Sequence, residues 1–242
     1  MKFTSRIITN RTLDLSDADF SEGEIILVDK PSGPTSFQVV SKIRKITGVK
    51  KVGHSGTLDP KASGLMIVCT GKKTKEMDRF TNLNKTYSGI IRLGLSSPSM
   101  DTETECSEIP LPEDITEEKI LEVRNSFLGE IEQTPPMYSA VKVGGKKLYN
   151  LARKGKTIKR EPRKIIIEKF EISKIDLPDI YFTITCSKGT FIRVIADDFG
   201  KKLKTGGILW ELRREGIGEY RVDEALTISS FSKQFLAQLA SE

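Results

Sequence analysis

The chain has 242 residues, of which 37% are hydrophobic and 30% are charged, and its net charge is +6. Three widely separated cysteines and a single histidine exclude a disulfide framework, a zinc site of the usual spacing and a histidine-rich metal site. No apolar run approaches the roughly 20 residues that a membrane-spanning helix needs, and residues 1–20 lack the apolar stretch of a signal peptide. We therefore expect a globular, metal-free protein in the reducing cytoplasm.

The charges are unevenly distributed along the chain. Residues 101–122 hold nine acids and one base, and this run is typical of a solvated surface. Residues 142–164 hold ten bases and one acid, with Tyr149 and several glycines between them. A basic stretch of this kind favours binding to phosphate groups, and thus a nucleic-acid partner.

The first half of the chain predicts a strand, a helix and two further strands. Residues 1–22 are polar and form an expected N-terminal extension. The apolar run 23–29 predicts a buried strand, which the turn-forming sequence KPSGP ends. Thr35 with Gln38 three residues later has the spacing of a capping box, and predicts a helix over 35–46. Strands are expected at 65–69 and 85–95.

The second half of the chain alternates between helical and extended patterns. Helices are expected at 116–127, 147–154 and 192–203, a hairpin turn at 143–146, strands at 165–167 and 181–186, and a helical tail from Ser229. The prolines of segment 133–140 exclude a regular helix or central strand there. Because these elements show no regular strand–helix–strand repeat, the predicted fold class is α+β.

The loop GHSGTLDP at residues 53–60 is the most informative segment for chemistry. Its glycines allow the backbone to approach a ligand closely, and Asp59 is its one acidic group. Asp59 followed by Pro60 is also the pattern of an ordinary helix N-cap with proline at the first helical position. The spacing alone does not separate a catalytic aspartate from a helix cap.

Several motifs together resemble those of the TruB family of pseudouridine synthases, in the same order along the chain. The resemblance extends from about Gly23 to Tyr220, and its motifs are DKPSGPTS at 29–36, GHSGTLDP at 53–60, QTPPMYSAVK at 133–142, SKGTFIR at 187–193 and LRR at 212–214. It implies the pseudouridine synthase fold, a mixed and mainly antiparallel sheet flanked by helices. It also implies isomerisation of uridine 55 in the T loop of tRNA, with Asp59 as the nucleophile. This reaction requires no cofactor and no metal.

The resemblance also implies roles for individual residues. Arg193 corresponds to the arginine that pairs with the catalytic carboxylate, and Tyr87 to an active-site tyrosine. His54 corresponds to the residue that fills the stack left by a flipped uridine, which suits a planar side chain in RNA binding. Without the family pattern, an arginine at a helix start favours a surface salt bridge, and a tyrosine at a strand start favours packing. The remaining substrate-binding residues that the resemblance implies are Leu212, Phe191, Lys30, Lys142, Lys146 and Lys147.

The implied domain organisation is a catalytic domain over 23–225 with a thumb-like insertion at about 133–164, followed by a short tail at 226–242. The sequence departs from the family in carrying Phe191 in place of a tyrosine and Ile208 in place of a histidine. We expect no separate C-terminal RNA-binding domain, so that the insertion clamps the tRNA. We also expect a monomer without an obligate protein partner and without membrane association.

Three alternatives compete with this interpretation. The chain could be the catalytic subunit of an RNA-guided pseudouridine synthase, although the insertion argues against that branch of the family. It could be a tRNA-binding chaperone that does not depend on catalysis. An aspartate-nucleophile hydrolase such as a phosphatase would need further acidic metal ligands near Asp59, which the sequence does not offer.

Overall fold

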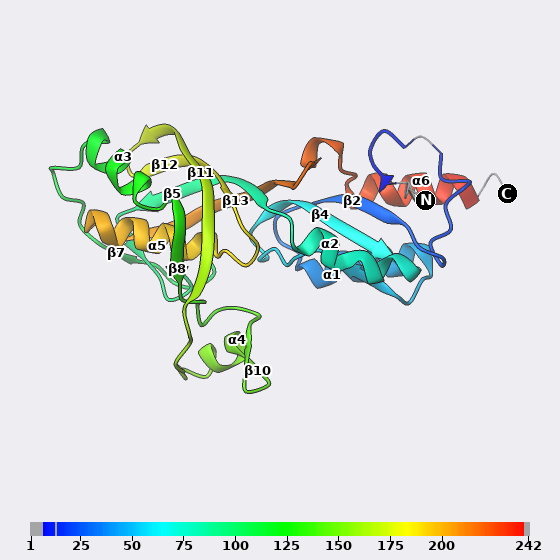
Figure 1. The fold of residues 1–242 in the computed structure, drawn as a ribbon, viewed down its shortest axis with the longest axis horizontal. Coiled ribbons are helices and arrows are strands. Elements are labelled where there is room, and N and C mark those ends of the chain that lie inside the picture. Colours follow the sequence, from blue (N-terminus) through cyan, green and yellow to red (C-terminus); the bar gives the residue numbers. More distant parts are fainter. Residues whose placement is uncertain (1–6, 13, 240–242) are drawn as a thin grey trace. The chain divides into compact units, whose positions relative to one another are not determined.

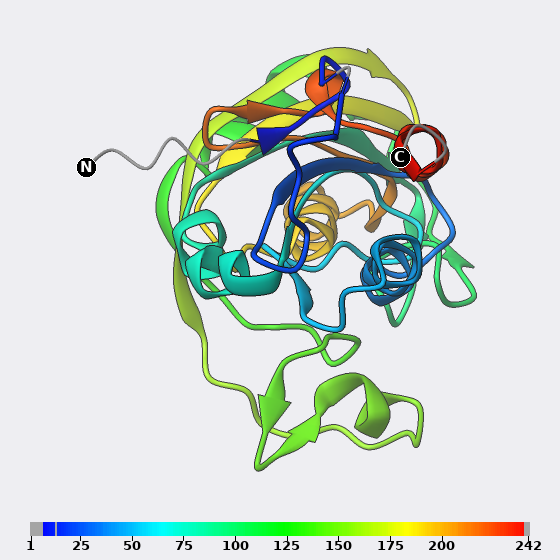
Figure 2. The same ribbon diagram turned by 90° about the vertical axis from the view of Figure 1, so that its right-hand side faces the viewer.

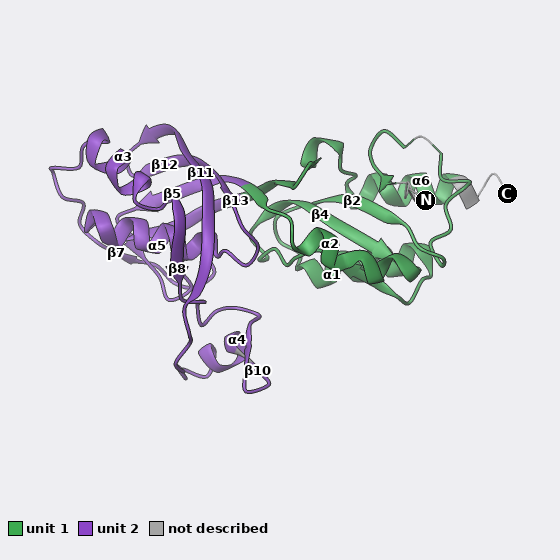
Figure 3. Cartoon of the chain, in the orientation of Figure 1, with its two compact units in different colours: residues 1–86, 213–242 green, residues 87–212 purple. Residues whose placement is uncertain are grey.

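The computed structural model describes residues 7–12 and 14–239, which fall into two compact units (Figure 3). Unit 1 contains the described residues up to Thr86 together with those from Arg213 onward, and unit 2 contains residues 87–212. Each unit is described separately below. None of the described helices is long and apolar enough to cross a membrane.

The sheet of unit 1 is built on two buried antiparallel strands, β2 and β4. Leu27 of β2 lies opposite Ile67 of β4, and both side chains are at most 1% exposed. Figures 1 and 2 show α1 and α2 on the same side of these strands. The elements of unit 1 are β1 (Ile7–Ile8), β2 (Ile25–Lys30), α1 (Ser36–Thr47), β3 (Val52–His54), β4 (Ser63–Thr70), η1 (Gly71–Glu76), α2 (Met77–Thr81), β14 (Tyr220–Arg221), η2 (Val222–Glu224) and α6 (Ile228–Leu239).

Helix α1 begins where the capping box predicts. The Thr35 hydroxyl accepts a hydrogen bond from the backbone N–H of Gln38, and the Gln38 side chain accepts one from the backbone N–H of Thr35. Gly48 ends the helix in the left-handed conformation. The apolar face that follows from this start packs inward, with Val39 and Ile43 at most 1% exposed. The predicted helix is therefore confirmed.

The sheet of unit 2 has the strand order β13-β5-β12-β11-β8, and strand β13 continues from unit 2 into unit 1. Four phenylalanine rings pack together, from the turn after α3, from α5 and from two strands. The ring centroids of Phe127 and Phe199 are 6.0 Å apart, and those of Phe170 and Phe182 are 5.9 Å apart. The elements are β5 (Lys85–Leu93), β6 (Leu95–Ser96), β7 (Ser107–Glu108), α3 (Glu117–Asn125), β8 (Gly129–Gln133), β9 (Lys142–Val143), β10 (Lys146–Lys147), α4 (Leu148–Ala152), β11 (Arg163–Asp176), β12 (Asp179–Cys186), α5 (Ile192–Leu203) and β13 (Gly207–Ile217).

Residues 134–162 form an insertion between two strands that are paired with each other. The last residue of β8, Gln133, lies opposite the first residue of β11, Arg163. From these ends the insertion projects away from the sheet of unit 2 (Figures 1 and 2). It contains the hairpin β9–β10 and the short helix α4, which confirms the hairpin turn and the helix expected there.

The α+β class with a mainly antiparallel sheet is confirmed. Among the described strands whose register is known, β1 with β2 and β13 with β4 pair in parallel, and the other pairs are antiparallel. Strand β11 is much longer than the predicted 165–167. Its outward positions carry lysine and glutamate along most of its length, so the apolar alternation was too weak to reveal it. The sequence pattern also did not predict β8, β13 or the helical segment 71–81.

Candidate active site

Asp59 lies in the loop between β3 and β4, and this loop is not a helix start. After Asp59 the chain makes a turn, in which the N–H of Ala62 donates to the carbonyl of Asp59 at 3.1 Å, and it then enters β4 at Ser63. No helix begins at Pro60. The helix-cap interpretation of Asp59 is therefore wrong, and the turn leaves the aspartate in an irregular loop.

The backbone of this loop is fixed by the start of α1. The buried hydroxyl of Ser36 accepts a hydrogen bond from the N–H of Leu58 at 2.9 Å and donates one to the carbonyl of the same residue at 3.0 Å. On the other side of the aspartate, the N–H of Gly33 donates to the carbonyl of Pro60 at 2.8 Å. Both neighbours of Asp59 in the chain are thus held by the KPSGPTS segment.

Lys30 holds the same loop from inside unit 1. Its side chain is 0% exposed, and its Nζ donates to the carbonyl oxygens of Pro31, Pro60 and Ala62 at 2.9, 3.1 and 2.5 Å. Burial lowers the pKa of Lys30 to about 8, against the attraction of the Asp59 carboxylate, which raises it. These three bonds hold the Asp59 loop, and the expected role of Lys30 in substrate binding stays a prediction.

Arg214 closes the loop from strand β13. Its side chain is 1% exposed, its Nε donates to the carbonyl of Leu65 at 2.7 Å, and its Nη2 donates to the carbonyl of Gly56 at 3.1 Å. Gly64 permits this close approach, because a Cβ atom at that position would lie 2.3 Å from the backbone oxygen of Arg214. Next to it, Arg213 forms a two-pronged ion pair with Asp29 at the end of β2.

His54 is the last residue of β3 and lies at the entrance of the same loop. The N–H of Gly56 donates to its Nδ1 at 3.3 Å, which requires this nitrogen to be unprotonated. Burial lowers the pKa of His54 below its usual value. The ring is therefore neutral at pH 7, and a neutral planar ring suits stacking better than ionic contact with phosphate.

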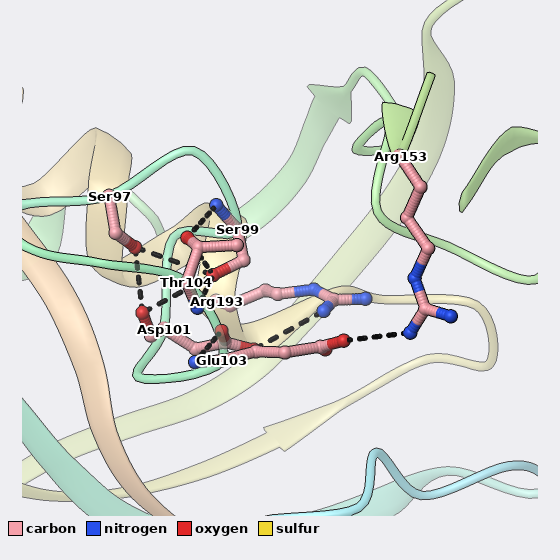
Figure 4. Close-up of polar contacts among 7 residues, drawn as sticks. All are labelled: Ser97, Ser99, Asp101, Glu103, Thr104, Arg153 and Arg193. Carbon is pink, nitrogen blue, oxygen red and sulfur yellow. Dashed lines mark hydrogen bonds and ion pairs between the residues drawn. The ribbon is translucent and has the colours of Figure 1, made fainter. Parts of the chain in front are cut away.

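In unit 2, Arg193 is buried near the start of α5 and is held by an aspartate. Its side chain is 3% exposed, and its Nη1 lies 3.3 Å from Oδ2 of Asp101 (Figure 4). The guanidinium also lies 5.9 Å from the centre of the Phe191 ring. The side chain of Gln133 bonds both the N–H and the carbonyl of Phe191, at 2.8 and 3.1 Å, and so fixes the backbone just before the helix.

Tyr87 and Leu212 are placed by neighbouring strands of unit 2. Tyr87 is the third residue of β5 and is 8% exposed, while Leu212 is half-buried in β13. Asp59 and Arg193 belong to different units, so their expected pairing, like the stacking role of Tyr87, stays a prediction.

The insertion carries the lysines that were expected to contact RNA. Lys142 lies in β9 opposite Lys147 of β10, and the side chains of Lys142 and Lys146 are exposed. Arg153, just after α4, lies 3.6 Å from Glu103 in the loop around Asp101 (Figure 4). Among the described residues, no group of His, Cys, Asp or Glu could hold a metal ion.

Sequence reasoning missed several supporting residues of the site. Asp101 begins the acidic run that was interpreted as a solvated surface, although it is the one acid among the described residues of that run that is not exposed. Ser36, Gln133 and Arg214 lie inside the motifs at 29–36, 133–142 and 212–214 but were given no role of their own, and their place in those motifs was the available signal.

Comparison with known proteins shows the family of this chain. Residues 44–192 match the model of the "TruB family pseudouridylate synthase (N terminal domain)". The chain belongs to the TruB family. A tRNA pseudouridine synthase B of Flavobacterium johnsoniae is 43% identical over 90% of this chain and 99% of its own length. Another, from Chlorobaculum tepidum, is 48% identical over 86% of this chain and 89% of its own length. As a member of this family, the chain is a pseudouridine synthase, an isomerase.

Solved structures of the family share the fold. A chain of a "Cbf5-Nop10-Gar1 Complex" superimposes with a TM-score of 0.71 and 31% identity, and the match covers 90% of the TruB-family chain described here. A chain of an H/ACA RNP bound to a substrate RNA gives a TM-score of 0.69 and 27% identity. The present chain spans 56% of the length of each of these two chains.

Proposed function

We propose that this chain converts uridine 55 in the T loop of tRNA to pseudouridine, with Asp59 as the nucleophile. The observation that carries the proposal is the fixed Asp59 loop, since the peptide groups of Leu58 and Pro60 on both sides of the carboxylate are bonded to buried partners. The names of relatives at 43% and 48% identity, each a tRNA pseudouridine synthase B, support tRNA as the substrate.

The reaction breaks the N1–C1′ bond of the uridine and forms a C5–C1′ bond after the base has turned within the site. N1 gains a proton and C5 loses one, so the product is an isomer and neither an oxidant nor a group donor is needed. A carboxylate suits this step, because a covalent intermediate with Asp59 divides one difficult substitution into two easier ones. Attack at C1′ and attack at C6 of the base are both compatible with an aspartate nucleophile.

A buried arginine can keep such a carboxylate ionised. Arg193 is 3% exposed, and its own charge is balanced by Asp101 at 3.3 Å. In the active enzyme Arg193 pairs with Asp59, and this pairing holds the nucleophile in its charged form. Lys30 contributes a second positive charge next to Asp59 from within unit 1. Tyr87 and Leu212 line the pocket that receives the base.

The target base must leave its stack before Asp59 can reach it, at a cost of a few kcal/mol. The neutral ring of His54 fills the vacated position and offsets part of this cost. The exposed Lys142 and Lys146, together with Lys147 and Phe191, place the T stem-loop through phosphate and shape contacts. The chain acts alone on its substrate in the cytoplasm, without a guide RNA or an obligate protein partner.

The test uses the purified chain and a tRNA transcript whose uridines carry tritium at C5. We expect tritium release without a guide RNA, and pseudouridine at position 55 alone. A matched transcript with cytidine at position 55 should release none. Tight binding of both transcripts with no release from either would favour the chaperone alternative, and release only after a guide RNA is added would favour the RNA-guided one.

A further inference from the structure

The loop that presents Asp101 to Arg193 has a backbone conformation that needs support. Its central residue, Met100, has a φ of 63°. This left-handed conformation is unfavourable for a residue with a side chain, so a short polar loop would not hold it unaided. The N–H of Met100 donates to the carbonyl of Ser97 at 3.0 Å, which closes the tight turn just before Asp101.

Two hydroxyl residues close the loop around Asp101. The N–H of Ser99 donates to Oγ1 of Thr104 at 3.1 Å, and the N–H of Thr104 donates to Oγ of Ser99 at 3.1 Å. The two hydroxyl groups share a further hydrogen bond of 2.8 Å (Figure 4). Ser99 is 0% exposed, so water cannot replace these bonds without opening the loop. This reciprocal pair ties the two ends of the Asp101 turn together.

The closed loop determines where the Asp101 carboxylate points. The carbonyl of Asp101 accepts hydrogen bonds from the hydroxyls of Ser97 at 2.6 Å and Ser99 at 3.3 Å. Its Oδ1 accepts the N–H of Glu103 at 2.9 Å, and this leaves Oδ2 directed at Arg193. With side-chain exposures of 14% and 3%, Asp101 and Arg193 have little access to water as an alternative partner.

We propose that Ser99 and Thr104 are positioning residues for pseudouridine formation, which act through Asp101 on the guanidinium of Arg193. The inference rests on the proposed function, in which Arg193 pairs with the Asp59 nucleophile. Loss of either hydroxyl lets the Asp101 carboxylate rotate, and Arg193 then follows it away from the position that catalysis needs. The two hydroxyls contact neither the substrate nor the reacting atoms.

The experiment measures single-turnover tritium release and KM for tRNA in Ser99→Ala, Thr104→Val and Thr104→Ser, with exposed Ser107→Ala as the control. Removal of a hydrogen bond that orients a catalytic group is expected to lower kcat about tenfold. KM should not change, because RNA contacts are untouched. Thr104→Ser, which keeps the hydroxyl, should retain the wild-type rate within about twofold, as should Ser107→Ala. Urea unfolding gives the folded fraction to which each rate is referred.

A mutant cycle with Asp101→Asn separates positioning from general stability. If Ser99 acts through the carboxylate, Ser99→Ala lowers the rate about tenfold in the wild type and less than about twofold in Asp101→Asn. An equal loss in both backgrounds would overturn the proposal, and so would a Thr104→Val enzyme as fast as Thr104→Ser. If Asp101→Asn is too slow to measure, the comparison of Thr104→Val with Thr104→Ser tests the proposal by itself. A wild type that releases no tritium would overturn the proposed function, and this inference with it.

Discussion

The hydroxyl of Ser36 offers the clearest test of how the Asp59 loop is held. Ser36 is the first residue of α1, whereas the cap of that helix is Thr35, so Ser36→Ala removes the loop contact and leaves the cap intact. The change leaves the N–H and the carbonyl of Leu58 without the bonds that they make to Ser36 at 2.9 and 3.0 Å. Ser36 is only 2% exposed, so water does not readily replace these bonds. Each buried group left unsatisfied costs about 1–3 kcal/mol, so the free energy of unfolding should fall by about 2–6 kcal/mol.

The same change should slow catalysis, because Leu58 precedes the nucleophile directly in the chain. A displacement of about 1 Å of a reacting group costs roughly a hundredfold in rate, and we expect kcat to fall by roughly 10–100-fold. Urea unfolding and single-turnover tritium release measure the two effects. Ser41→Ala, at an exposed position of the same helix, is the matched control and should change stability by less than about 0.5 kcal/mol. Ser36→Ala behaving like Ser41→Ala would refute the loop-holding role.

Further predictions concern charge, backbone strain and RNA binding. Because the pKa of Lys30 is lowered from 10.5 to about 8, the unfolded chain binds more protons than the folded chain between pH 8 and 10.5. The unfolding free energy of the wild type relative to Lys30→Met should therefore rise by about 3 kcal/mol from pH 8 to 10.5, and a flat difference would contradict the burial of the ammonium. Gly64→Ala should lower the free energy of unfolding by more than about 3 kcal/mol, since a Cβ would lie 2.3 Å from a backbone oxygen of β13. Gly33 has a similar φ, but nothing lies within 4 Å of its Cβ position. Gly33→Ala should therefore lower the free energy of unfolding by about 1–2 kcal/mol, and thermal unfolding measures both variants. The double variant Lys142→Ala with Lys146→Ala should weaken tRNA binding. The slope of the logarithm of the binding constant against the logarithm of the salt concentration should become shallower by about one or more, and an unchanged slope would exclude contact of these lysines with phosphate.

Local patterns predicted the elements that frame the site. Helix α1 could be predicted because its start depends on Thr35 and Gln38, three residues apart, and the structure contains both bonds of that capping box. The turn that follows Asp59 could not be distinguished from a helix cap, since the sequence Asp-Pro is compatible with both. The choice depends on carbonyls that bond to Lys30, a residue far away in the sequence.

The supporting residues of the site were hidden for the same reason. Asp29 and Arg213 are 184 positions apart, and Arg193 and Asp101 are 92 apart, so no local pattern connects them. Charge counting even assigned Asp101 to a solvated run. Burial of a single carboxylate depends on the packing of α5 and the neighbouring loop, and composition does not record that packing.

In the proposed reaction, the carboxylate of Asp59 attacks a flipped uridine. The most direct measurement compares wild type and Asp59→Asn for tritium release from C5-labelled tRNA under single-turnover conditions, with tRNA affinity measured for both. Asparagine is close in shape to aspartate but is a poor nucleophile. We expect release to be abolished while affinity stays within about threefold. Release that survives the substitution would contradict it.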